Sequence, residues 1–105
     1  MVKAAVIGVG AMGQHHARIY AQLPETQLVG VTDANAEAAA RIARLYHTEA
    51  FTDHHQMLKQ KAPDVVTVAV PTEFHHQVAL DALDAGCHVL IEKPIAATEE
   101  QALDL

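Results

Sequence analysis

A glycine-punctuated turn directly after a short apolar segment is the feature that most constrains this chain. Residues 2–7 form an apolar run typical of a strand, and they lead into the pattern G-x-G-x-x-G made by Gly8, Gly10 and Gly13. Each glycine has its own reason: Gly8 for a tight turn, Gly10 for backbone approach to a pyrophosphate, and Gly13 for close helix–strand packing. The helix that follows would point its free N–H groups and positive dipole end at the phosphates. The pattern therefore predicts a dinucleotide-binding turn.

An acidic residue follows the second predicted strand at a spacing that suits nucleotide binding. Strand residues 28–32 end at Asp33, which lies 20 residues after Gly13, close to the spacing at which a carboxylate reaches a ribose. A second interpretation is that Asp33 only caps the next helix, but the strand-turn-helix-strand context favours the ribose. A carboxylate there also favours NAD over NADP, because it repels a 2′-phosphate and Ala34 and Asn35 supply no arginine to receive one.

The rest of the chain alternates apolar strands with helical segments. Further strands are predicted at 50–51, 65–70 and 88–91 with helices between them, so the order is β-α-β-α-β-α-β-α-β. Short connections and right-handed crossovers then require a parallel sheet with helices on both faces. The predicted fold class is α/β, a doubly wound parallel sheet of the Rossmann type with about five strands in the order 3-2-1-4-5, ending before a sixth strand.

The helices carry their own boundary and packing signals. Asn35 and Asp53 stand where helix N-caps are expected, and Gly86 stands where a left-handed C-terminal cap belongs. Helical spacing predicts one packed face on each of two helices. On the first helix this face comprises Met12, His16, Ile19, Tyr20 and Leu23. On the helix near residues 73–85 it comprises Val78, Ala79, Ala82 and Leu83.

Composition limits the partners and the compartment. The 105 residues are enough for one domain, and 13 acidic against 7 basic residues give a formal net charge of −6. Without a basic run, this charge argues against nucleic acid as a partner. The single cysteine, Cys87, excludes an internal disulfide and suits a reducing compartment, so we expect a cytoplasmic protein. No stretch approaches the length of a membrane span, so no membrane partner is expected.

Spaced motifs along essentially the whole chain resemble the N-terminal half of the Gfo/Idh/MocA family, the glucose-fructose oxidoreductase and inositol dehydrogenase type of enzyme. The motifs are the glycine turn with Met12 and with His16 three residues after Gly13, Asp33 at the end of strand two, Pro71-Thr72-x-x-His75, and Ala85-Gly86-x-His88-Val89 leading into Glu92-Lys93-Pro94. Together they are far more specific than the glycines alone.

The resemblance implies hydride transfer between a nicotinamide and a hydroxyl-bearing carbon of a sugar, polyol or related substrate. It makes Lys93 the expected catalytic contact, reaching both cofactor and substrate, and it implies a cis bond before Pro94. His75 has an alternative role as a helix-start residue that bonds only backbone. The expected cofactor-binding set is Gly8, Gly10, Ala11, Met12, Gly13, Asp33, Pro71, Thr72, His75, Glu92 and Lys93. Within it, the resemblance places Pro71, Thr72 and His75 on the nicotinamide side and Glu92 near the ribose.

The C-terminal residues shape the expected domain organisation. Residues 98–101 read as a capping box, and after the cap at Thr98 only about seven helical residues remain, fewer than an isolated helix needs. We interpret residues 1–105 as a dinucleotide-binding domain incomplete at its C-terminal end, without the family's substrate domain and not catalytically complete alone. If strand 88–91 is unpaired at the sheet edge, we expect the chain to form a homo-oligomer.

Two other functions and a metal site are weighed against this interpretation. An S-adenosylmethionine-dependent methyltransferase also uses a glycine turn and an acid after strand two, but the motif Glu92-Lys93-Pro94 argues against it. A free-standing nucleotide-binding or sensor module without catalysis is the second alternative. Paired histidines such as His54 and His55 lack the i, i+4 spacing that puts two ligands on one helix face, so no metal site is expected.

Overall fold

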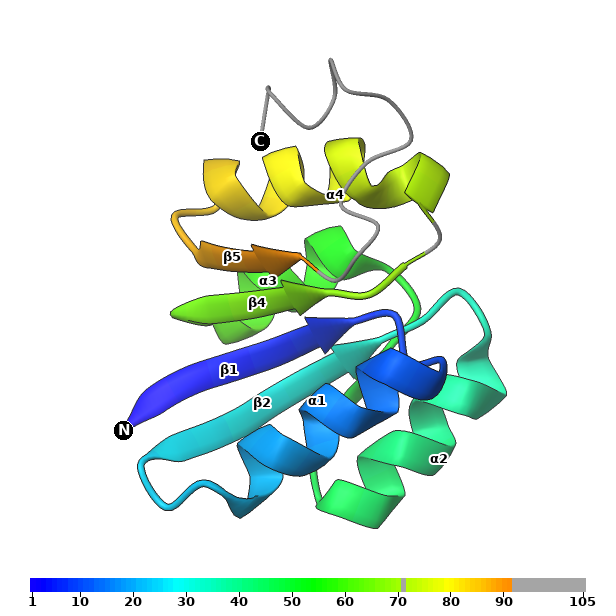
Figure 1. Cartoon of the computed structure of the whole chain (residues 1–105), viewed down its shortest axis with the longest axis vertical. Helices are drawn as coiled ribbons and strands as arrows, with labels where there is room; N and C mark the ends of the chain where they lie inside the picture. Colours follow the sequence, from blue (N-terminus) through cyan, green and yellow to red (C-terminus); the bar gives the residue numbers. More distant parts are fainter. Residues whose placement is uncertain (71, 92–105) are drawn as a thin grey trace.

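Strands and helices alternate along the chain as the sequence predicts. The structure is a computed structural model that describes residues 1–70 and 72–91 (Figure 1). Its strands are β1 (Val2–Ile7), β2 (Thr26–Thr32), β3 (Ala50–Phe51), β4 (Val65–Val68) and β5 (His88–Ile91). Its helices are α1 (Ala11–Gln22), α2 (Ala36–Tyr46), α3 (His54–Lys61) and α4 (Thr72–Asp84).

The strands form one parallel sheet of five strands in the order β3-β2-β1-β4-β5, which confirms the predicted topology. Strand β1 lies in the centre between β2 and β4. Its last residue, Ile7, is in register with Thr32 of β2 and with Val68 of β4. The carboxyl ends of these three strands therefore meet at one edge, and the loops that leave them, with the glycine turn and Asp33, lie together there.

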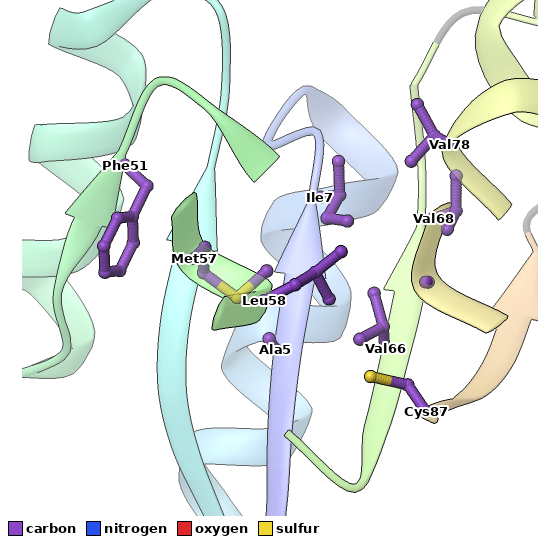
Figure 2. Packing of buried hydrophobic residues seen from close by; sticks show 10 residues of the cluster. Ala5, Ile7, Phe51, Met57, Leu58, Val66, Val68, Val78 and Cys87 are labelled. Carbon is purple, nitrogen blue, oxygen red and sulfur yellow. The ribbon is translucent and has the colours of Figure 1, made fainter. Parts of the chain in front are cut away.

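Helices cover both faces of the sheet, and strand alternation supplies a core to each face (Figure 1). Ala5 and Ile7 of β1 pack with Met57 of α3 and Val78 of α4, as Figure 2 shows from close by. Val6, which lies between them and points to the other face, belongs to the cluster of α1 and α2. Period-two alternation in a strand that is buried on both sides explains why β1 reads as a continuous apolar run.

Two predicted helix faces need correction. Leu23 follows α1 as its C-cap and is 46% exposed, while the buried centre of α1 is Ala17, at 0% exposure, which the sequence analysis did not select. Since Gly13 packs onto the turn, the residue one helical turn later faces the sheet. On α4, Val78, Ala79 and Ala82 are buried as predicted, but Leu83 is 45% exposed. Residues rotate about 100° along a helix, and Leu83 falls on the flank of this face.

The predicted helix boundaries are found in the structure. The side chain of Asn35 accepts a hydrogen bond from the backbone N–H of Ala38 at 3.1 Å and caps α2. Asp53 caps α3 by accepting from the N–H of His55 at 2.9 Å. Gly86, after α4, has φ +85°, the left-handed conformation that glycine adopts without strain. Among the described residues no helix is long and apolar enough to cross a membrane.

Candidate cofactor-binding site

The glycine turn is held in place by its two neighbouring strands. Gly8 has φ +94°, and its N–H donates to the carbonyl of Thr32 at 2.7 Å. A Cβ at this position would lie 2.6 Å from the carbonyl oxygen of Ala69, the residue that follows β4. Both the backbone angle and the close approach of β4 therefore require glycine.

The other two glycines differ in their surroundings. A Cβ on Gly13 would lie 1.7 Å from the carbonyl oxygen of Gly8, so α1 can pack against the turn only if this residue has no side chain. A Cβ on Gly10 would meet no atom of the part of the chain that the structure describes within 4 Å. Space is thus open above the backbone of Gly10, where a bound group could approach it closely.

Helix α1 begins directly at this open position. Gly10 is its N-cap residue and has no side chain with which to cap the helix, and the first turn of α1 contains no acidic residue. The first N–H groups of a helix have no intrahelical partner and carry the positive end of the helix dipole. The N-terminus of α1 is therefore suited to an anionic group such as a phosphate.

The Asp33 carboxylate links the end of β2 to the glycine turn. Its Oδ2 accepts from the N–H of Val9 at 2.9 Å, and its Oδ1 accepts from the N–H of Asn35 at 2.9 Å. Asn35, not Asp33, caps α2, so the simpler interpretation of Asp33 as a helix cap does not describe its contacts. A carboxylate has about four acceptor sites, which leaves about two for further donors such as ribose hydroxyls.

Two supporting contacts of the turn are absent from the sequence analysis. The Gln14 amide donates to the carbonyl of Val9 at 3.2 Å, and Ala69 packs its backbone against Gly8. Both depend on the folded path of the turn, and no spacing rule indicates them. The N–H of Ala69 also donates to the carbonyl of Ile7 at 2.8 Å, which fixes the end of β4 against β1.

The remaining predicted site residues fall partly or wholly outside the described part of the chain. Pro71, Glu92 and Lys93 lie outside it, as does the expected cis bond before Pro94. Four other predicted site residues lie in helices whose backbone alone is described at these positions. Ala11 and Met12 stand in α1, and Thr72 and His75 stand at the start of α4. Gly8, Gly10, Gly13 and Asp33 are brought together in the structure, and their cofactor contacts stay predictions.

Comparison with known proteins identifies the family. Residues 2–105 match the Gfo/Idh/MocA family, described as an oxidoreductase family with an NAD-binding Rossmann fold. The chain belongs to this family. The match argues against the methyltransferase alternative.

Named relatives of this Gfo/Idh/MocA chain are dehydrogenases. D-glucoside 3-dehydrogenase of Escherichia coli is 39% identical over 99% of the chain and 30% of its own length. UDP-N-acetylglucosamine 3-dehydrogenase of Acidithiobacillus ferrooxidans is 42% identical over 96% of the chain and 31% of its own length. The solved structure of myo-inositol dehydrogenase from Lactobacillus casei in complex with NAD(H) and myo-inositol is 34% identical, with a TM-score of 0.90 over 99% of the chain and 32% of its own. The chain thus spans about a third of the length of these relatives.

Proposed function

We propose that this chain is the NAD-binding part of a dehydrogenase that transfers hydride between a nicotinamide and a hydroxyl-bearing carbon of a sugar, polyol or related substrate. The observation that carries the proposal is the uncapped N-terminus of α1, which opens onto the free space above Gly10 beside the oriented carboxylate of Asp33. The substrates named for the relatives, a glucoside, a nucleotide sugar and an inositol, support the substrate class.

The described residues would hold the phosphate and adenosine-ribose portion of the cofactor. The backbone at Gly10 and the first N–H groups of α1 would receive the pyrophosphate, because a side chain is absent there and the helix dipole favours an anion. Asp33, already oriented by the N–H groups of Val9 and Asn35, would accept from ribose hydroxyls. The same carboxylate would repel the 2′-phosphate of NADP, which favours NAD.

The reacting end of the site is assigned through the family resemblance. Lys93 would contact cofactor and substrate, orient the reacting hydroxyl and lower the pKa of a neighbouring acid-base group. Pro71, Thr72 and His75 would line the nicotinamide side, and Glu92 would lie near its ribose. When bound, NAD accepts or donates the hydride. The chain's own residues would supply position and charge.

Location and assembly complete the proposal. The single cysteine suits a reducing compartment, which supports a cytoplasmic location. Among the described strands β5 lies at an edge of the sheet, next to β4, which supports self-association of the 105-residue chain. The substrate itself would bind in the full-length protein, because the relatives are about three times as long as this chain.

Calorimetric titration tests the cofactor assignment. The 105-residue chain is titrated with NADH, NADPH and S-adenosylmethionine. We expect binding of NADH, much weaker binding of NADPH and none of S-adenosylmethionine. Asp33→Ala should weaken NADH binding by about 10- to 100-fold, as expected for the loss of charge-assisted hydrogen bonds.

A matched control removes a carboxylate elsewhere. Asp84, the exposed last residue of α4, is replaced in Asp84→Ala, which should bind NADH like the parent chain. Equal binding of NADH and NADPH, or equal losses in the two variants, would refute the role of Asp33. A folded chain that binds none of the three ligands would refute the proposal that these residues form a sufficient cofactor site.

A further inference from the structure

Two histidines at the start of α3 converge on a carboxylate from α4. His54 Nε2 lies 2.8 Å from Oδ2 of Asp81, and His55 Nε2 lies 2.9 Å from the same oxygen. The two imidazole rings lie 4.2 Å apart between centroids, tilted by 31°. Asp53 also faces this group, with its Oδ1 3.3 Å from Nδ1 of His55. We call these four residues the α3–α4 cluster.

Tertiary structure creates this arrangement. Sequence spacing argued against a metal site because adjacent helical residues point about 100° apart. However, His54 and His55 stand in the first turn of α3, and their long side chains reach the same oxygen of a residue 27 and 26 positions further along the chain. Helices α3 and α4 cover the same face of the sheet, which brings Asp81 into range.

The carboxylate at the centre of the cluster is oriented and charged. Asp81 has a side chain only 13% exposed, and its Oδ1 accepts from the Gln77 amide at 2.9 Å, which leaves Oδ2 to the histidines. Burial raises the pKa of Asp81, but hydrogen bonds from His54 and Gln77 and the charges of the two imidazoles outweigh burial and lower it overall. Asp81 is therefore an anion at neutral pH.

We propose that the α3–α4 cluster binds one divalent transition-metal ion of the zinc class through His54, His55 and Asp81. One ligand atom each from Asp53, His54 and His55 already lies within 4.8 Å of the others. The 2.8 and 2.9 Å contacts with Asp81 are shorter than the roughly 3.3–3.6 Å that separates neighbouring tetrahedral ligands at about 2.0–2.2 Å from an ion, so the side chains would move apart slightly to admit it. Two imidazoles select zinc-class ions over Mg²⁺ and Ca²⁺, which prefer oxygen ligands.

Metal binding would exchange protons for a metal ion at this cluster. In the metal-free chain Nε2 of His54 shares a hydrogen bond with Asp81 Oδ2, and Nε2 of His55 lies 2.9 Å from the same oxygen. A metal needs the lone pairs of those nitrogens, so binding must release protons or move them to the other ring nitrogen. The ion would connect α3 to α4 and stabilise the folded chain. No residue of the glycine turn and no atom of Asp33 takes part.

The test is a calorimetric titration of the chelator-treated 105-residue chain with ZnCl2, and with MgCl2 as the comparison ion. We expect one zinc ion per chain and no binding of magnesium. Zinc at about 100 times its dissociation constant should raise the melting temperature by roughly 10 °C. His55→Gln and Asp81→Asn should each weaken zinc binding roughly 10-fold or more.

His47→Asn is the matched control, because His47 is an exposed histidine of another loop and asparagine tolerates its left-handed backbone at φ 56°. It should bind zinc like the parent chain. The His55 side chain is 64% exposed, so His55→Gln is expected to fold, and circular dichroism checks this. The test therefore still holds if Asp81→Asn does not fold. A folded parent chain that binds no zinc, or equal zinc binding by His55→Gln and His47→Asn, would overturn the proposal.

Discussion

Gly10 and Gly13 stand three residues apart in one motif and have opposite environments. Gly13 has no room for a methyl group, because the carbonyl oxygen of Gly8 would lie 1.7 Å from its Cβ. A Cβ on Gly10 would meet no atom of the described residues within 4 Å. The packing of the described residues therefore explains Gly13, but it does not require glycine at position 10.

This contrast predicts different effects of the same substitution. Gly13→Ala should lower the free energy of unfolding by about 1–3 kcal/mol or more, because α1 must move away from the turn. Gly10→Ala should change stability by no more than about 0.5 kcal/mol, yet weaken NADH binding. Urea unfolding and calorimetric titration of both variants measure these effects. A large loss of stability in Gly10→Ala, or unchanged NADH binding in it, would contradict the assignment.

At the scale of elements, β5 differs from the other outer strand. Strand β3 has two residues, whereas β5 has four, pairs with β4 from Val65↔His88 to Val68↔Ile91, and exposes 49% of Leu90. Among the described residues no strand pairs with its other side. A longer edge strand with an exposed apolar side chain presents N–H and carbonyl groups to another chain.

We therefore expect the 105-residue chain to self-associate through β5. Light scattering at about 100 μM, well above the dissociation constants of weak dimers, should give a mass above that of the monomer. Leu90→Lys should restore the monomer, because a charged side chain on an edge strand opposes pairing. Leu45→Lys, which changes a leucine on α2 that is 60% exposed, is the control and should leave the mass unchanged. A monomeric mass for the parent chain would refute this expectation.

For the whole molecule, the amino ends of three strands are joined near Cys87. The side-chain Oδ2 of Asp64 accepts a hydrogen bond from the backbone N–H of Lys3 at 2.8 Å. The backbone carbonyl of Asp64 accepts one from the N–H of His88 at 2.9 Å. The thiol of Cys87 is buried in the core beside Val66 (Figure 2). Burial, and secondarily the charge of Asp64, raises the pKa of Cys87 above its ordinary value of 9.0.

Because of this raised pKa, the free energy of unfolding should decrease at alkaline pH. Because the folded chain holds the thiol proton more tightly than the unfolded chain, the stabilisation is fully present below pH 9.0 and is lost as pH rises through the folded pKa. The slope from one such group is at most about 1.4 kcal/mol per pH unit. The free energy of unfolding, measured with urea between neutral and alkaline pH, should fall less steeply for Cys87→Ala than for the parent chain. If the two free energies fall in parallel with pH, the effect is excluded.

Local patterns in the sequence were sufficient to predict the fold. Alternating strands and helices, the caps Asn35 and Asp53, and the right-handed crossover rule led to the order 3-2-1-4-5, and the structure confirms it. These features depend on neighbours along the chain, on periodicity and on handedness, which a sequence displays directly. The glycine turn and Asp33 were found for the same reason.

Contacts between distant segments were decided only by the tertiary structure. Ala17 is the buried centre of α1 because Gly13 contacts the turn, and Gly8 is confined by the backbone of Ala69, 61 residues later. Asp81 meets His54 and His55 because two helices pack on one face of the sheet. Sequence therefore determined the elements, their order and the chemistry of the turn. Packing decided which side chains face each other, because it depends on the relative placement of elements that no local pattern encodes.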